Sequence, residues 1–349
     1  MKIAQIAPLW YSIPPEKYGG TERVIHNLTE GLVKAGHDVT LFASGDSQTS
    51  ANLVATRPTA LIKSGVPWRD SSANMYNFAQ AMEQADQFDV IHSHMHLNAA
   101  FFSKFINTPI VHTMHNIPGL KDWRWEIFQN YKDIYNPVFI SKKQMENAKN
   151  YSGIEYKNSW VVYNSVDTDH FAYNEKPDDY FVWLGLITKV KGIENAIAAA
   201  KKAGSRLKLA GKPNDHDSSY FDKVIKPLLD DKIEFVGELG GQDLVNFYQG
   251  AKALVFPIEW EEPFGLVMTE AMSCGTPVIA YKRGSVPEIV EDGKNGFIVE
   301  NIDGIVEAMK NIDSINRQNC RQTVLDKFTN DIMAKQYEQI YKEIVQSNA

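Results

Sequence analysis

The sequence is poor in the residues that would build a disulfide framework or a cysteine metal site. It has only two cysteines in 349 residues, Cys274 and Cys320, and their separation matches no metal-ligand spacing. No apolar run approaches the roughly 18 residues that a membrane-spanning helix requires. The opening residues MKIAQIAPLW form a strand-like run that is too short for a secretory signal. These absences favour a cytoplasmic protein.

The charge is not that of a nucleic-acid-binding protein. The formal net charge is −7, with a near-neutral first half and an acidic second half. Neither half has the basic patch that a phosphate backbone requires, so we expect no nucleic-acid partner. Membrane-surface association is left open by the near-neutral half, but no segment supports it. The length and the 44% hydrophobic content suffice for two core-forming domains.

Short apolar runs alternate with helical patterns, which predicts an α/β protein with parallel, doubly wound sheets. The alternation pauses at a polar stretch around 164–179 and then restarts, so we expect two Rossmann-like units. The first domain is placed at 1–165, the second at 166–328 and a terminal helical segment at 329–349. The runs expected as strands are 2–7, 38–43, 88–92, 109–113, 137–140, 160–163, 180–184, 207–210, 233–236, 253–256 and 278–280. The clearest helical patterns are 21–34, 73–86, 141–149 and 331–345.

The segment EWEEPFGLVMTEAMSCGTP, residues 259–277, carries the most specific pattern. The apolar spacing after Pro263 predicts a helix that ends near Gly275, with Glu262 before it and Glu270 within it. Eight residues of helix would span ~12 Å. The first free backbone N–H groups of this helix form an anion site, at Gly265, Leu266 and Val267.

An anion site between two carboxylates suits a nucleotide-sugar, which has a ribose, a diphosphate and a hexose. The alternative is an ordinary amphipathic helix with one exposed and one capping glutamate. A second anion site is expected where Gly19 and Gly20 allow close backbone approach, with Thr21 as the N-cap. A plain strand-to-helix loop explains the two glycines equally well.

Two polar runs have the residue types of a metal site. His92, His94 and His96 alternate, but no carboxylate or cysteine follows at ligand spacing, so we expect His92 to end a strand and the others to fill a loop. The Asp167-Thr168-Asp169 triplet is expected to form a turn. No metal is therefore expected.

Further along the chain, His115 is equally compatible with a catalytic role and with a hydrogen-bonded loop position.

These segments together resemble glycosyltransferase family 4, which has the GT-B fold. The resemblance rests on Glu262-Pro263-Phe264-Gly265-Leu266, on Glu270-Ala271-Met272 and on Gly275-Thr276-Pro277-Val278, and it extends to the Gly19-Gly20 loop, the His112–His115 run and Lys191-Gly192. It implies two Rossmann-like domains whose parallel sheets face each other across a cleft, with the terminal helix crossing back to the first domain. It also implies a retaining enzyme that uses a UDP- or GDP-sugar and needs neither a metal nor another cofactor.

The resemblance implies roles for particular residues. His115, Glu262 and Lys191 would be catalytic: the histidine beside the reacting sugar, Glu262 on the sugar hydroxyls and Lys191 on the diphosphate. Glu270 would bind the ribose diol. The remaining donor-binding residues would be Gly19, Gly20, Gly211, Lys212, Glu238, Leu239, Phe264, Gly265, Leu266 and Val267.

One position departs from the family pattern. Where the family has a second phosphate-binding cation, an arginine, this chain has Leu186, and Lys189 stands nearby. Because Val182, Leu184 and Leu186 alternate, we expect Leu186 on a buried strand face.

Two other functions share the fold: a nucleotide-sugar epimerase, and a catalytically weak sugar-nucleotide-binding protein. The sequence does not identify the acceptor, which could be a saccharide, a lipid-linked molecule or a small molecule. It is compatible with a monomer or a homodimer.

Overall fold

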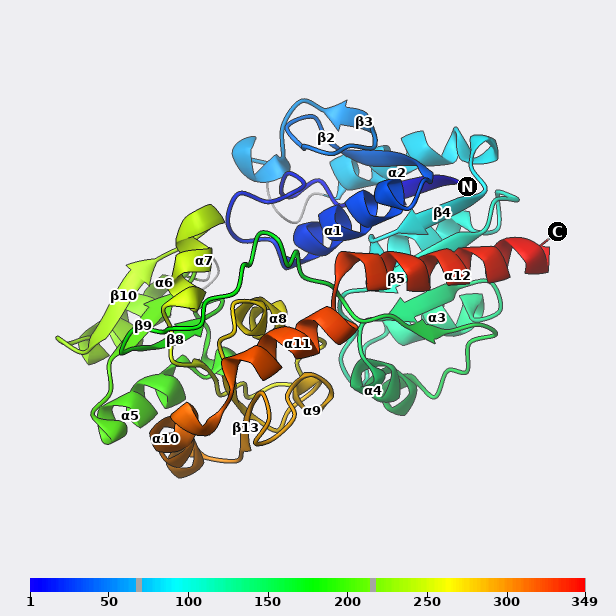
Figure 1. The fold of residues 1–349 in the computed structure, drawn as a ribbon. Coiled ribbons are helices and arrows are strands. Elements are labelled where there is room, and N and C mark those ends of the chain that lie inside the picture. Colours follow the sequence, from blue (N-terminus) through cyan, green and yellow to red (C-terminus); the bar gives the residue numbers. More distant parts are fainter. Residues whose placement is uncertain (67–70, 214–217, 349) are drawn as a thin grey trace. The chain divides into compact units, whose positions relative to one another are not determined.

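The computed structural model describes residues 1–66, 71–213 and 218–348, which form two compact units (Figure 1). Unit 1 comprises Met1–Pro15, Gly19–Ser165 and Asn330–Ala349. Unit 2 comprises Glu16–Tyr18 and Val166–Thr329. Within the described residues, no helix has the length and apolar character needed to cross a membrane.

Unit 1 is built on a parallel sheet with the strand order β3-β2-β1-β4-β5-β6-β7 in its described residues. The strands are β1 Lys2–Ile6, β2 Asp38–Ser44, β3 Asn52–Arg57, β4 Val90–Ser93, β5 Ile110–Met114, β6 Asn136–Phe139 and β7 Trp160–Val161. The α-helices are α1 Gly20–Lys34, α2 Ser72–Met82, α3 Arg124–Tyr131, α4 Lys142–Ser152 and α12 Asn330–Asn348. The order reverses between β1 and β4, as in a doubly wound sheet.

The two faces of this sheet differ in character. One face packs apolar residues such as Ile6, Phe42 and Ile91 against Phe78 of α2. The opposite face lies against α12, whose tyrosines hydrogen-bond to side chains of β4 and β5. Helix α12 also lies close to α1, because Gly31 has no side chain and a Cβ there would be 3.0 Å from Ala334. The last segment of the chain is therefore part of the unit 1 core.

Unit 2 has a second parallel sheet, with the order β10-β9-β8-β11-β12-β13 in its described residues. The strands are β8 Phe181–Leu184, β9 Leu207–Ala210, β10 Ile233–Gly237, β11 Leu254–Phe256, β12 Val278–Tyr281 and β13 Gly296–Val299. The α-helices are α5 Ile193–Ala203, α6 Ser218–Tyr220, α7 Gly241–Gln249, α8 Leu266–Ser273, α9 Val286–Ile289, α10 Ile302–Asn311 and α11 Arg317–Lys327. Here the order reverses between β8 and β11.

The α/β class and the doubly wound sheets confirm the sequence prediction, and each expected strand is present with its ends at most two residues from the predicted ones. Strands β3 and β13 were not predicted, because each is a partly exposed edge strand without a clear apolar alternation. The helix expected over 73–86 ends earlier: α2 stops at Met82, and a 3-10 turn follows at Ala85–Gln87.

Candidate functional site

The reversal of strand order in unit 2 places two predicted site residues near each other. The chain leaves β8 and β11 toward opposite sides of the sheet, and such a switch point opens a crevice at the carboxyl ends of the strands. Lys191 ends the short 3-10 turn Lys189–Lys191 in the connection after β8, and Glu262 lies in the loop after β11. Gly192 allows these loops to approach, because its φ is +71° and a Cβ there would collide with the Pro257 carbonyl.

Lys191 and Glu262 form an ion pair at this switch point. The Lys191 Nζ atom lies 2.6 Å from Glu262 Oε2, and the two side chains are 22% and 11% exposed. Trp260 Nε1 donates to the same oxygen at 2.9 Å, and its ring centroid lies 4.8 Å from the lysine Nζ. A charge-assisted bond with such limited solvent access is stronger than a surface ion pair. The cation predicted for the diphosphate therefore contacts the carboxylate predicted for the sugar.

The loop after Glu262 leads directly into α8. Gly265 precedes the helix with a φ of +78°, a conformation that favours glycine. Ser285 holds this loop from the other side: its Oγ donates to the Phe264 carbonyl at 2.7 Å, and its backbone N–H donates to the Glu262 carbonyl at 3.0 Å. The helix start at Leu266 and Val267 thus lies close in sequence to the ion pair, and its N–H groups are suited to an anion.

Glu270 lies inside α8, as predicted, and is 4% exposed. Its Oε2 accepts a hydrogen bond of 3.1 Å from the Tyr248 hydroxyl of α7. Only part of the spacing between Glu262 and Glu270 is helical, because α8 begins at Leu266. The expected ~12 Å helical span is therefore wrong; the helical part, from Leu266 to Glu270, rises ~6 Å.

The residues predicted to surround the base lie beyond the carboxyl ends of β9 and β10. Gly211 has a φ of +146° and approaches the Gly185 backbone so closely that a Cβ would collide with its carbonyl. Its N–H donates to the Gly237 carbonyl at 2.9 Å, and the Lys212 carbonyl accepts from Ile187 at 2.9 Å. These contacts hold the ends of β8, β9 and β10 side by side.

Two further predicted residues continue this edge. The Glu238 carboxylate accepts a hydrogen bond of 3.2 Å from the Tyr18 N–H. Leu239 follows and is half-buried.

Leu186 corrects one expectation. It lies two residues beyond the end of β8 and is half-buried, whereas Val182 is fully buried inside the strand. The alternation that predicted a buried face stops at Leu184, because Gly185 ends the extended strand. Leu186 is therefore not a core residue.

The Gly19-Gly20 loop in unit 1 follows β1, one of the two strands at that unit's switch point. Helix α1 begins at Gly20 with Gly19 as the N-cap, at a φ of 146°. Thr21 is thus inside the helix, and its prediction as the N-cap is wrong. Gly19 packs so tightly that a Cβ would lie 2.7 Å from Pro15 and 3.0 Å from the Glu22 carboxylate. That carboxylate is 5% exposed, and its burial raises the pKa of Glu22 to about 7.

The histidines of unit 1 form part of a buried polar network. His115 is 6% exposed, and its Nε2 lies 2.9 Å from Nδ1 of His94. His92 is the penultimate residue of β4, which ends one residue later than predicted, at Ser93; the complete burial of His92 holds its pKa well below the usual value. His112 is stacked on Tyr135 with ring centroids 4.0 Å apart, and burial lowers its pKa to about 3.

The two polar runs with residue types of a metal site have other roles where the structure describes them. Oδ1 of Asp167 accepts hydrogen bonds from the N–H groups of Asp169 and His170, which confirms the predicted turn. The His96 side chain lies outside the described part. In the described part of the chain, no group of three or more His, Cys, Asp or Glu side chains could hold a metal ion.

The sequence missed several residues that contact the predicted ones. Trp260 stands two residues before Glu262 and touches both members of the ion pair, and Tyr248 bonds to Glu270. Gln5, which bonds to His94, carried a readable signal: it is a polar residue in the middle of an apolar strand that is buried on both faces.

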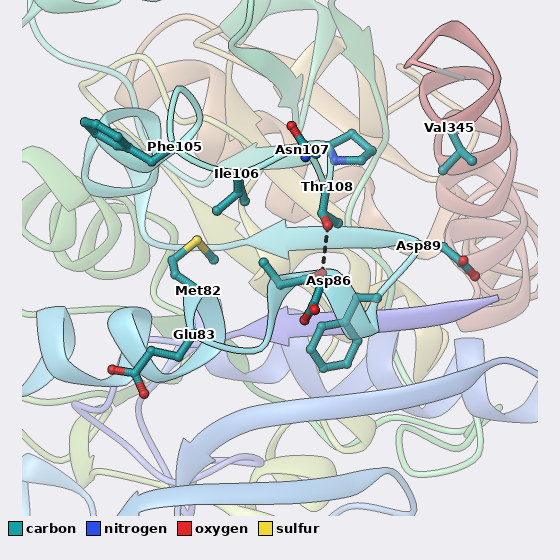
Figure 2. Close-up of a pocket in the computed structure, with 12 residues that line it drawn as sticks. Met82, Glu83, Asp86, Asp89, Phe105, Ile106, Asn107, Thr108 and Val345 are labelled. Carbon is teal, nitrogen blue, oxygen red and sulfur yellow. Dashed lines mark hydrogen bonds between the residues drawn. The ribbon is translucent and has the colours of Figure 1, made fainter.

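Unit 1 also has an open pocket, which is lined by none of the predicted site residues (Figure 2). It lies at the amino ends of β4 and β5, with Asp86 and Asp89 before one strand and Ile106 and Thr108 before the other. Thr108 Oγ1 donates to the Ala85 carbonyl at 2.7 Å, as Figure 2 shows. Doubly wound sheets bind ligands at the opposite, carboxyl ends, and none of the predicted site residues lines this pocket.

Comparison with known proteins gives consistent matches over nearly the whole chain. Residues 165–324 match the model for glycosyl transferases group 1, and residues 18–170 match the model for Glycosyltransferase Family 4. An uncharacterized glycosyltransferase of Methanocaldococcus jannaschii is 26% identical over an alignment covering 98% of each chain.

Two solved structures share the fold. Sucrose-phosphate synthase from Thermosynechococcus elongatus has a TM-score of 0.82 at 20% identity and covers 99% of both chains. Anabaena HepE, solved in complex with UDP and glucose, has a TM-score of 0.75 at 19% identity, covering 98% of this chain and 99% of its own.

Proposed function

Because this chain belongs to glycosyltransferase family 4 and has the GT-B fold, we propose that it transfers a sugar from a UDP- or GDP-sugar to an acceptor hydroxyl with retention of anomeric configuration. The glycosyltransferase class rests on the family, whereas donor, stereochemistry and acceptor are our proposal. Anabaena HepE, which was solved with UDP and glucose, supports a nucleoside-diphosphate donor. The matched relatives favour transfer over epimerisation.

The observation that carries this proposal is the Lys191–Glu262 contact of 2.6 Å at the β8–β11 switch point. In a nucleotide-sugar, the bond that breaks joins the sugar to the diphosphate. A cation for the phosphate and a carboxylate for the sugar hydroxyls must therefore lie within a few ångströms of each other. The start of α8 adds N–H groups that favour negative charge.

Each residue then has a defined part in transfer. Lys191 and the α8 start stabilise the charge that develops on the departing diphosphate. Glu262 accepts hydrogen bonds from sugar hydroxyls, and Glu270 accepts them from the ribose diol. His115 lies beside the reacting sugar. The chain segments that line the donor are Phe264–Val267 for sugar and phosphate, Gly211–Lys212 and Glu238–Leu239 for the base, and Gly19–Gly20 for the phosphates.

The departing phosphate receives the proton of the acceptor hydroxyl in this proposal. The acceptor then attacks the face that the diphosphate leaves, which retains the anomeric configuration. The bond from the anomeric carbon to the diphosphate oxygen breaks, and a bond to the acceptor oxygen forms.

The test is nucleotide release from a panel of UDP- and GDP-sugars, with and without saccharide, lipid-linked and small-molecule acceptors. We expect release that depends on the acceptor, and a product with the anomeric configuration of the donor. Glu262→Gln should lose turnover, whereas Glu259→Gln should retain it, because Glu259 is exposed and its Oε1 accepts a hydrogen bond from Asn195 at 2.8 Å, away from the Lys191–Glu262 pair. An inverted product would refute the retaining mechanism.

We also propose that transfer needs no metal ion, because Lys191 and the α8 N-terminus supply positive charge at the leaving diphosphate. Activity should survive EDTA and should not rise when Mg²⁺ or Mn²⁺ is added back. Loss of turnover in EDTA with recovery on one divalent ion would contradict this.

A further inference from the structure

A row of buried polar side chains runs along the face of the unit 1 sheet that α12 covers. The parallel register pairs Gln5 of β1 with His92 of β4, so both side chains point to the same face, and His94 follows two residues later on that face. We call Tyr341, His92, Gln5, His94 and His115 the polar row. All five are at most 6% exposed, so their polar atoms must find partners inside the protein.

The Gln5 amide determines which atoms donate along the row. Its oxygen lies 2.8 Å from Nε2 of His94, and a carbonyl oxygen only accepts, so Nε2 of His94 carries a proton. In a neutral imidazole, Nδ1 is then an acceptor. The proton in the 2.9 Å contact between His94 Nδ1 and His115 Nε2 therefore belongs to His115. Neutral His115 has its lone pair on Nδ1.

Tyr341 of α12 and His92 of β4 are both partners of the Gln5 amide nitrogen. Gln5 Nε2 donates to the Tyr341 hydroxyl at 3.2 Å and lies 3.3 Å from His92 Nδ1. The Tyr341 hydroxyl in turn lies 2.6 Å from His92 Nδ1, so it fixes both the amide and the imidazole that faces it. His92 Nε2 in turn lies 2.7 Å from Thr113 Oγ1. If the amide turned by 180°, its NH₂ group would face His94, and every donor and acceptor along the row would exchange.

We propose that Tyr341 and Gln5 are positioning residues that keep the proton of His115 on Nε2, so that Nδ1 accepts a hydrogen bond from a substrate hydroxyl. The proposal rests on the proposed function for the identity of that hydroxyl, which belongs to the donor sugar or the acceptor. It gives α12 a part in the chemistry, since a hydroxyl on this helix determines the protonation of a side chain beyond the end of β5.

The direct test measures the tautomer of His115 in the full chain. Long-range ¹H–¹⁵N correlation spectra of ¹⁵N-histidine-labelled protein distinguish a protonated from an unprotonated ring nitrogen, and His115→Gln assigns the signals. We expect the Nε2–H tautomer in the wild type and a mixture of both tautomers in Tyr341→Phe. A wild-type His115 with its proton on Nδ1, or a Tyr341→Phe spectrum identical to the wild type, would overturn the proposal.

Tyr337→Phe is the matched control. It removes the same atom from the same face of the same helix, but the Tyr337 hydroxyl contacts Thr113 Oγ1 at 2.6 Å rather than the Gln5 amide. Thr113 is also the partner of His92 Nε2, so this variant alters the far end of the hydrogen-bond chain and leaves both partners of the Gln5 amide nitrogen in place. Its His115 tautomer should be that of the wild type. An equal change in both variants would show a general effect of weakening α12 and would overturn the specific role of Tyr341.

Substitutions of Gln5 keep the test independent of α12. Gln5→Met has a similar shape but offers His94 no strong acceptor, so it should give mixed tautomers. Gln5→Glu keeps an oxygen toward His94 and should retain the Nε2–H tautomer. Retention in both variants would refute the role of the amide.

Kinetics separate this inference from the proposed function. If both hold, kcat of Tyr341→Phe should fall roughly two- to tenfold with an unchanged donor KM, in proportion to the lost tautomer population. A changed tautomer with unchanged kcat would support the role of Tyr341 in setting the His115 tautomer and would refute the substrate contact of His115. Absence of transfer with every donor and acceptor would count against the proposed function alone, since the spectra need no turnover.

Discussion

Glu22 is expected to make the stability of unit 1 depend on pH near neutrality. Its carboxylate lies in the first turn of α1, where the helix dipole favours a negative charge by only about 0.3–1 kcal/mol. Burial acts in the opposite direction and is larger, so the pKa of Glu22 rises from 4.5 to about 7, although a hydrogen bond from its own backbone N–H lowers it in part. The protonated form is therefore favoured in the folded chain.

The magnitude follows from the difference in pKa between the folded and unfolded chains. The pKa of Glu22 is about 2.5 higher in the folded chain than its ordinary value of 4.5. At 1.36 kcal/mol for each pKa unit, this difference corresponds to about 3 kcal/mol of folding free energy. Because the folded pKa is the higher one, this stabilisation is fully present below pH 4.5. It is lost as the pH rises through about 7. Glu22→Gln, which cannot ionise, should gain stability relative to the wild type over this range.

The assay is native-state hydrogen exchange of β1 and α1 amides from pH 5 to pH 8, which reports unit 1 alone in a chain of two units. We expect wild type and Glu22→Gln to be similar at pH 5, and the variant to be more stable by about 3 kcal/mol at pH 8. A difference that does not change with pH would show that Glu22 ionises normally, and would refute this reasoning.

Glu30, on the same helix, is the control. Burial raises the pKa of Glu30, but hydrogen bonds from Ser50 and Thr49 outweigh it and leave the pKa below its usual value. Its stabilisation is therefore present above the unfolded pKa and is lost only as the pH falls, so Glu30→Gln should be destabilising at pH 8, the opposite sign to Glu22→Gln.

Three predictions concern the donor site. Lys191→Ala should lower both kcat and donor affinity, because it removes the cation at the departing diphosphate, whereas Lys189→Ala should be close to wild type; equal kinetics of the two variants would contradict the assignment. Glu270→Ala should weaken binding of a free nucleoside diphosphate by ~1.5–3 kcal/mol in calorimetry, and unchanged affinity in a folded variant would remove Glu270 from the site. Leu186→Arg should keep the fold and leave donor KM unchanged or lower, because this position is half-buried; a large drop in the unfolding temperature would indicate a buried side chain.

The sequence predicted those parts of the site that depend on local pattern. The helix after Pro263 and the placement of Glu262 and Glu270 about it follow from apolar spacing and a C-terminal glycine, both of which act over a few residues. The carboxyl-end positions of Lys191 and Gly211 follow from the strand–helix alternation.

Contacts between distant segments could not be predicted in this way. The Lys191–Glu262 pair joins residues 71 positions apart, and the Gln5–Tyr341 bond joins residues 336 apart. No periodicity links such positions. The burial of Leu186 was mispredicted for a local reason: alternation was extended past Gly185, where the strand had ended.

The place of α12 in unit 1 has a consequence for the order of folding during synthesis. The ribosome makes α12 after all of Val166–Thr329, so the sheet of unit 1 emerges long before the helix that covers one of its faces. Until then Gln5, His92 and Thr113 lack the tyrosine hydroxyls that bond to this row in the finished chain. Unit 2 has no such dependence and is free to fold first, since domains generally fold as units as they emerge. The nascent first unit would be the aggregation-prone species and the natural client of a chaperone, with α12 as its closing step.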